Sequence, residues 1–182
     1  ACSRIRANAA AVLGDIGDPL GVPALLRLKE TDEDTVVKER AVAALQNIGG
    51  ASAPVIGAAN AYTRLGERFY ANDSAVVMDF GDTRTVWRWE GDLVRYNVPA
   101  YLYPYQMAEQ MALDALEIEP GNLRASTLLV RALLAQKVEA DVLVANGGEA
   151  PEVLKGAFDL AAAQGYAAAT EALRECLKDR DW

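Results

Sequence analysis

Apolar residues recur at helical spacing through most of this chain, and the first clear pattern runs from Arg4 to Gly17. A second stretch, Val36 to Gly49, carries apolar residues at matching positions, with an offset of 32 residues. In each copy they fall at i, i+4, i+7, i+8 and i+11, which is one face of an amphipathic helix. A glycine follows each isoleucine and supplies the left-handed position that commonly ends a helix. The pattern therefore predicts two equivalent helices.

The segments that follow these two helices also resemble each other. "DPLGVPALLRL" begins at Asp18 and "GASAPVIGAA" begins at Gly50, so that Pro23 aligns with Pro54. Proline is accepted in the first turn of a helix, where its missing N–H would be unpaired in any case. The sequence thus predicts units of two helices. A unit of about 31 residues is too small to bury its own apolar face and must stack on its neighbours.

The stretch "RANAAAVLGDIGDPLGVPALLRL" is similar to a HEAT repeat of the short bacterial type, in which an Ala-rich helix ends in "LGxIGDP" and "xVPxLxxxL" begins the next unit. The resemblance covers residues 4 to about 66. It implies a stack of helical hairpins. Because Ala1 falls at the second helix of a unit, we expect the chain to be an excerpt of a longer protein.

A second helical segment, Met107 to Gln136, follows a different pattern. It resembles the junction between two tetratricopeptide (TPR) repeats, because Ala108, Ala115 and Pro120 fall at that family's spacing. Val130 departs from the family pattern, which usually has a small residue at that position. The resemblance implies TPR-like helical hairpins in the second half of the chain.

Two more amphipathic helices are expected after this segment, one beginning at Pro151 and one after Gly165, with a loop over residues 144–153 before them. The apolar residues expected to face the core are Val153, Leu154, Ala157, Phe158, Ala161, Ala169, Ala172, Leu173, Cys176 and Leu177.

Between the two helical parts the pattern changes to strands. "SAVVMDF" (74–80), "TVWRWE" (85–90) and "LVRYNV" (93–98) are short, β-branched and aromatic, and turn-forming residues separate them. The pattern predicts a β-hairpin and leaves a third strand open. Because successive side chains on a strand point to opposite faces, Trp87 and Trp89 should share one face.

Two interpretations of this hairpin are open. Since an isolated hairpin is seldom stable in water, the favoured one packs both tryptophans onto the helices around Phe69 or around Met107 and Met111. The other is an exposed platform for a peptide or a sugar, because Trp, Tyr and Arg dominate the energetics of interfaces. Its candidate partner-binding residues are Trp87, Arg88, Trp89, Arg95 and Tyr96.

Together these patterns predict a mostly α protein: a right-handed α-solenoid of HEAT-like and then TPR-like hairpins, with a small β-hairpin insert. The predicted domains are HEAT-like repeats at residues 1–70, the hairpin insert at 71–100 and TPR-like hairpins at 101–182.

Charge and composition restrict the function. The net charge of −8 falls entirely within residues 71–182, which disfavours nucleic acid and anionic membrane surfaces as partners. The chain has no histidine, the commonest general base and zinc ligand. The acidic loop "ETDEDT" (30–35) lacks the spacing of a calcium loop, so capping of the next helix is expected. We therefore expect no catalytic residue, metal, cofactor or membrane-spanning segment.

The expected function is a non-enzymatic protein–protein interaction module or scaffold within a larger protein, because solenoids present extended surfaces to protein partners. One alternative is a carbohydrate- or peptide-binding module centred on the aromatic hairpin. Another is an accessory subunit of an enzyme, as with the HEAT-like lyases that attach bilin pigments, whose repeats resemble residues 4–66. We expect a soluble protein, with the cytoplasm favoured over export.

Overall fold

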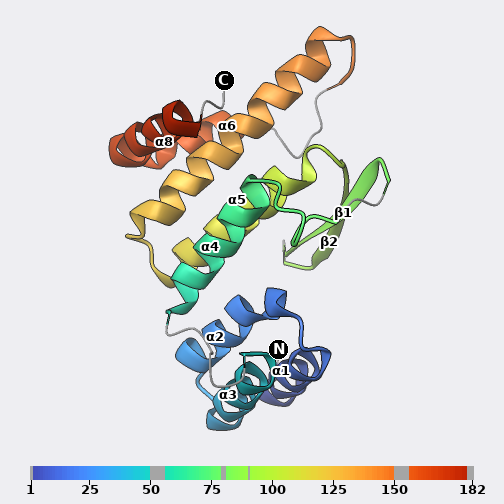
Figure 1. Ribbon diagram of the computed structural model, residues 1–182, viewed down its shortest axis with the longest axis vertical. Coiled ribbons are helices and arrows are strands. Elements are labelled where there is room, and N and C mark those ends of the chain that lie inside the picture. The colour runs from blue at the N-terminus through green and yellow to red at the C-terminus, as the bar shows by residue number, and fades with distance from the viewer. Residues whose placement is uncertain (1, 50–55, 79–80, 90, 150–155, 180–182) are drawn as a thin grey trace.

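The computed structural model describes residues 2–49, 56–78, 81–89, 91–149 and 156–179, and these form a mostly helical molecule with one small sheet (Figure 1). The predicted helical architecture with a hairpin is confirmed, whereas the handedness of the solenoid stays a prediction. Expectations for Pro54, Glu90 and Pro151 fall outside the described residues. The elements are α1 (Ser3–Ile16), η1 (Pro19–Gly21), α2 (Val22–Thr31), α3 (Thr35–Gly49), α4 (Ala58–Tyr70), β1 (Thr83–Trp89), β2 (Leu93–Pro99), α5 (Tyr103–Ile118), α6 (Leu123–Ala145), α7 (Ala157–Ala163) and α8 (Gly165–Asp179).

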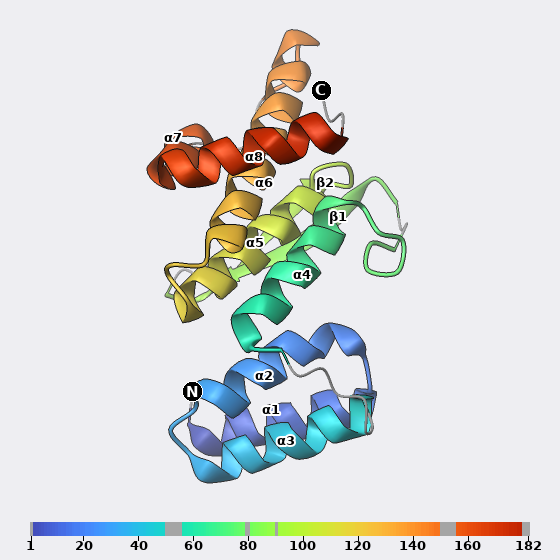
Figure 2. The same ribbon diagram turned by 60° about the vertical axis from the view of Figure 1, so that its left-hand side comes forward.

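The first three helices pack together at one end of the molecule (Figure 2). Helices α1 and α3 approach so closely at Gly14 that a Cβ atom added there would lie only 2.7 Å from the Cα atom of Ala44. Small residues at this crossing allow the two backbones to meet. The buried residues of this core are Ala10, Leu25, Leu26, Ala41, Ala44, Leu45, Ala58 and Ala61.

The helix ends follow the predicted signals at Gly17 and Pro23 and depart from them at Gly49. Gly17 is left-handed, with φ of 74°, and its N–H donates to the carbonyl oxygen of Leu13 at the end of α1. Pro23 lies in the first turn of α2. In the second copy, however, Gly49 is still helical, so the expectation that the helix stops before it is wrong.

The acidic loop between α2 and α3 caps a helix, as predicted. The carboxylate of Asp34 accepts the N–H of Val36 at 2.9 Å, in the first turn of α3. Asp32 accepts two hydrogen bonds from the Arg6 guanidinium, at 2.6 and 2.9 Å, and one from the N–H of Asp34. These bonds, chiefly those from Arg6, lower the pKa of Asp32 to about 2.

Helix α4 belongs to two cores. Ala58 and Ala61 complete the core of α1 to α3, while Tyr62 and Phe69 belong to a second core with α5, α6 and α7. Gly66 permits the second contact, because a Cβ there would lie 3.0 Å from the Cβ of Met111 on α5. The predicted domain boundaries at residues 70 and 100 stay predictions. Helix α4 ends at the first boundary and contributes side chains to the cores on both sides of it.

Helices α5 and α6 are both longer than the sequence pattern suggested. Helix α5 already begins at Tyr103, and α6 continues past Gln136 to Ala145, over 23 residues. The side chain of Asn122 caps α6 by accepting the N–H of Ala125 at 3.0 Å. The first residues unsuited to a helix come only at Asn146 and the following glycine, so the loop expected from residue 144 starts later.

The last two helices bury small residues and expose large ones. Ala157, Ala161, Ala168 and Ala172 are buried in α7 and α8. Phe158, Ala169, Leu173 and Leu177 are exposed, so the expectation that they face the core is wrong. The reason is that α7 and α8 pack on α6 through alanines. Cys176 is partly buried, and Val153 and Leu154 lie outside the described residues.

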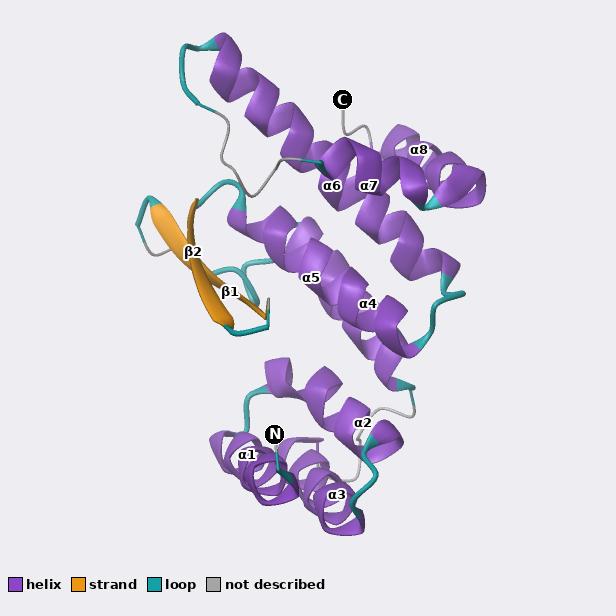
Figure 3. Cartoon of the chain, turned by 180° about the vertical axis from the view of Figure 1, so that it is seen from behind, coloured by secondary structure: helices purple, strands orange, loops and turns teal. Residues whose placement is uncertain are grey.

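The two strands form an antiparallel hairpin, drawn in orange in Figure 3. Residues 74–76 form a turn, residue 77 is a bend and residue 78 has no regular structure, so a third strand is absent from the described part of the predicted 74–80 segment. The N–H groups of Val76 and Val77 both donate to the carbonyl oxygen of Asp73, which is a helical turn. Among the described residues, no helix has the length and apolar character needed to cross a membrane.

Candidate functional site

The hairpin register sorts the five predicted partner-binding residues onto two faces. Trp87 lies directly opposite Arg95, and Trp89 lies opposite Leu93. Side chains of directly opposed residues point to the same side of a sheet, so these four residues form one surface, here called the outer face. Arg88 and Tyr96 are offset by one residue and point to the other side, the inner face, as the two-residue period predicts.

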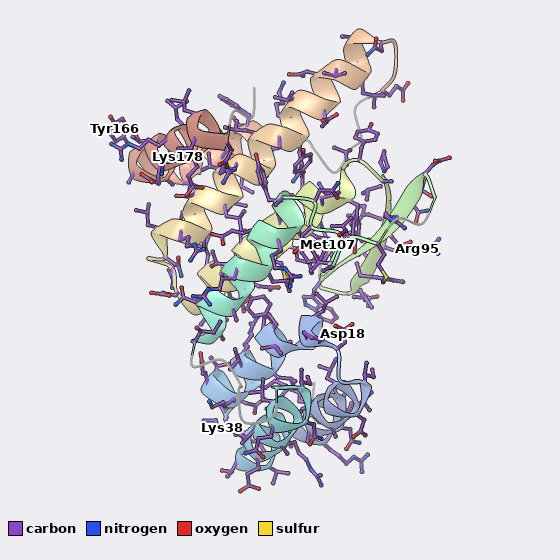
Figure 4. The ribbon with its side chains drawn as sticks, in the orientation of Figure 1. Asp18, Lys38, Arg95, Met107, Tyr166 and Lys178 are labelled. Atoms are coloured by element: carbon purple, nitrogen blue, oxygen red, sulfur yellow. The ribbon has the colours of Figure 1, made fainter. Side chains whose placement is uncertain are left out.

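The outer face is open to solvent. The exposed fractions are 50% for Trp87, 75% for Trp89 and 58% for Leu93, and Arg95 is exposed at the outer side of the hairpin (Figure 4). The expectation that both tryptophans pack against the helices around Phe69, Met107 or Met111 is therefore wrong. The hairpin does pack on the helical body, but it uses the side of Val86 and Val98, which are buried to 1% exposure.

The inner face is fixed to the helices by a buried polar network, here called the glutamine network: Arg88, Gln106, Glu109 and Gln136. Gln106 and Glu109 lie on α5 and Gln136 on α6, and both glutamines are fully buried. The Nη2 atom of Arg88 donates to Oε1 of Gln106 at 2.6 Å and lies 3.2 Å from a carboxylate oxygen of Glu109. The network thus joins one strand to two helices.

Gln136 closes this network. Its Nε2 atom donates to the Glu109 carboxylate at 2.8 Å and to the carbonyl oxygen of Tyr105 at 3.2 Å. Its Oε1 atom accepts a hydrogen bond from Nε2 of Gln106. Within the described part of the chain, Nε of Arg88 has no hydrogen-bond partner. A buried network of this kind specifies one arrangement, because any shift leaves polar groups unpaired in a medium of low dielectric constant.

A second arginine holds the start of the hairpin. The guanidinium of Arg84 donates to the carbonyl oxygen of Met78 and lies over the ring of Tyr103, 6.0 Å from its centroid. Tyr103 in turn packs edge-on against Phe69, at 6.3 Å between ring centroids. Burial raises the pKa of the Tyr103 phenol. Both arginines on the inner side of β1 therefore anchor the strand, so Arg88 is a structural residue and not part of an exposed platform.

Sequence reasoning missed the residues that orient the hairpin. Gln106, Glu109 and Gln136 look like ordinary helix-surface residues in the sequence, and nothing local distinguishes them. One signal was available in the alternation of β1. Val86 and Arg88 share one side of the strand, and the tryptophans share the other side with Arg95. Whichever side packs on the helices, an arginine therefore lies on it. A charge there requires buried polar partners.

The outer face offers hydrophobic contact and one cation, and no group arranged for covalent or acid–base chemistry. Two indoles alternate with Arg88 along β1, and Leu93 and Arg95 extend the surface across to β2. Over the residues the structure describes, no group of three or more potential metal ligands is found. The arrangement suits the burial of an apolar surface against a partner.

The comparisons with known proteins identify the helical repeat. The family model described as PBS lyase HEAT-like repeat matches residues 5–31, which span α1, η1 and α2. The match identifies a HEAT-like repeat over these residues, as the sequence pattern predicted there. The TPR-like resemblance stays a prediction. No curated protein and no solved structure matches the chain.

Proposed function

We propose that this chain is a non-enzymatic protein–protein interaction module, and that the outer face of the hairpin contacts the partner. One observation carries the proposal: Trp87 and Trp89 are held in solvent by a hairpin whose other side is fixed by the glutamine network. Trp is enriched among residues that dominate binding energy. A surface held in place before binding loses little conformational freedom when a partner arrives.

The energetics favour a partner over permanent exposure. A tryptophan can bury roughly 150–250 Å² of surface, at roughly 25 cal/mol per Å² of apolar area. Two neighbouring indoles and Leu93 together provide the apolar centre of an interface, and Arg95 provides a polar group at its rim. HEAT-like repeats commonly mediate protein contacts, which agrees with this role.

The test compares two aromatic positions. Quantitative mass spectrometry should identify proteins that co-purify with the chain from its source cells, for wild type and for variants. We expect a defined protein to be retained by Tyr166→Ala, a control at an exposed aromatic residue on α8, far from Arg95 (Figure 4). The same protein should be lost from the double variant Trp87→Ala/Trp89→Ala, with circular dichroism unchanged.

A direct contact is then checked by crosslinking. A photoreactive amino acid in place of Trp89 should crosslink to that protein, and the same group in place of Tyr166 should not. Retention of every co-purifying protein by the double variant would contradict the proposal. Binding to oligosaccharides that the double variant loses would instead support the carbohydrate-binding alternative.

A further inference from the structure

A groove of about 820 Å³ lies on another side of the helical body, between α6 and α8. The end of α4 and the start of α5 complete its walls. The residues that line it include Tyr70, Arg131, Leu134, Val138, Glu139 and Asp179. None of them belongs to the hairpin, so this surface is separate from the outer face.

The groove lies on the opposite side of α6 from the glutamine network. Leu134 and Val138 are each two residues from Gln136 in sequence. At 3.6 residues per turn, their side chains point roughly 160° away from it. The core side of α6 therefore holds the hairpin, and the side turned away from it forms the floor of the groove.

Arg131 fixes the shape of the groove. Its guanidinium lies 4.3 Å from the ring centroid of Tyr70 on α4. It also pairs with Glu175 and Asp179 of α8, each at 2.7 Å. One partly buried arginine thus ties three helices together. Its own positive charge is opposed by two carboxylates, so it does not make the groove basic.

An exposed apolar stripe continues the groove along α6. Leu134, Val138 and Val142 are spaced by four residues, and all three are exposed, Val138 to 60%. Residues at this spacing lie above one another on one side of a helix. Figure 1 shows the C-terminal end of α6 extending beyond the other helices, and the exposed fractions of the three side chains show that the stripe is accessible.

The charges around this surface are mostly negative. Three carboxylates, Glu67, Glu139 and Asp179, line the groove together with one guanidinium. Glu67 pairs with Arg124 and Asp179 pairs with Arg131, so the uncompensated negative charge lies at Glu139. Glu139 has no ion-pair partner among the residues described here. An occupant with positive charge beside its apolar residues would complement both features of the surface.

We propose that the groove and the Leu134–Val138–Val142 stripe dock an amphipathic helix of a partner protein, with Lys or Arg flanking its apolar ridge. A helix fits better than an extended segment because α6 and α8 use their backbone groups internally. They offer no strand edge for an extended peptide to pair with. A helix satisfies its own backbone and needs only side-chain contacts.

The test uses a synthetic amphipathic peptide of roughly 15 residues, long enough for helix formation on a surface, with a leucine ridge flanked by lysines. A matched peptide carries glutamate in place of every lysine. Fluorescence anisotropy measures affinity for the full chain, and amide chemical shifts locate the binding site. We expect binding of the lysine peptide, with shifts on α6 and α8, and binding of the glutamate peptide weaker by about tenfold or more.

Two pairs of variants locate the site. Val138→Asp should lower the affinity for the lysine peptide about tenfold. Val12→Asp, at a similarly exposed valine of α1 (55%), should leave that affinity unchanged. Glu139→Lys should weaken binding and reduce its salt dependence, unlike Glu39→Lys on the exposed surface of α3. Because these side chains project into solvent or line an open groove, the variants should fold.

Three results would overturn the proposal: equal loss in Val12→Asp and Val138→Asp, equal binding of both peptides, or shifts spread over the whole surface. Self-association that Val138→Asp abolishes would also overturn it, by making the occupant a second copy of the chain. The double variant Trp87→Ala/Trp89→Ala should bind the peptide normally. The peptide experiments therefore test the groove alone. Helix docking in the groove can fail while the proposed role of the hairpin holds, and the role of the hairpin can fail while docking in the groove holds.

Discussion

The contact between α1 and α3 and the contact between the hairpin and the helices hold elements together in opposite ways. At Gly14 the two helices meet through small apolar residues, and the specificity lies in how closely the backbones approach. At Gln136 the contact consists of hydrogen bonds among buried polar side chains. The first tolerates no added volume, and the second tolerates no missing partner. This difference can be measured by substitutions that add volume or remove partners.

The largest expected effect is that of added volume at the apolar contact. Gly14→Ala places a Cβ 2.7 Å from the Cα atom of Ala44, so the helices must separate. We expect the free energy of unfolding to fall by about 3 kcal/mol, although alanine favours helices. Gly21→Ala is the control, because its Cβ would lie 3.5 Å from the Leu13 side chain. Urea denaturation measures both, and equal effects would show that close approach is not the cause.

The next largest effect is that of a missing partner in the glutamine network. Gln136→Leu removes the hydrogen bonds that Gln106, Glu109 and the Tyr105 carbonyl oxygen make with Gln136, which should cost about 2 kcal/mol. The double variant Gln106→Leu/Gln136→Leu should lose less than the sum of the single variants, because both buried amides are then removed. Strict additivity in a double-mutant cycle would mean that the two amides do not depend on each other.

A smaller effect separates the two faces of the hairpin. Val86→Ala removes buried side-chain volume and should cost about 1.5 kcal/mol, from ~0.8 kcal/mol per buried CH₂ group. Trp89→Ala removes a much larger side chain, yet it should change the free energy of unfolding by less than about 0.5 kcal/mol, because the indole is exposed. Denaturation curves of the two variants decide this. A large loss in Trp89→Ala would mean that the indole packs in solution.

The smallest expected effect concerns the ion pair that links α1 to the acidic loop. The pKa of Asp32 is lowered to about 2 in the folded chain from an ordinary 3.8. Its contribution to stability is thus present above about pH 4 and is lost as the pH falls toward 2. Asp32→Asn should be less stable than wild type at neutral pH, and the gap should close at low pH. A gap that persists at pH 2 would indicate another cause.

The helical repeats could be predicted in some detail because their signals are local. Periodic apolar residues, Gly17 and Pro23 each act within one or two turns of their own position. Whether a face is covered, however, depends on neighbours. Val12 of α1 is exposed while its repeat equivalent Ala44 in α3 is almost completely buried. The same pattern therefore predicted both helices and could not predict their burial.

The site was predicted only in part for the same reason. Alternation along β1 correctly separated the tryptophans from Arg88. The hydrophobicity of the tryptophans then favoured their side of the strand as the buried one, which is wrong. The side of Arg88 packs instead, because it bonds to Gln106, which in turn bonds to Gln136, 30 residues further along the sequence. Nothing in the sequence around either glutamine indicates that the two side chains are hydrogen-bonded to each other. The groove beside α8 was missed because Val138 and Glu139, which line it, lie on the part of α6 beyond Gln136, where the sequence pattern had not predicted a helix.

The position of the hairpin between α4 and α5 has a consequence for how the chain folds. These two helices pack against each other although roughly 30 residues separate them, and each doubling of a loop costs only about 0.6 kcal/mol of closure entropy. The hairpin pairs neighbouring residues and can close within about 1–10 μs. Once Thr83 meets Pro99, the effective loop is much shorter. The insert thus shortens the loop that closes when α4 and α5 pack. Because Arg88 needs Gln106 of α5 for its hydrogen bond, strand pairing and the docking of α5 should support each other.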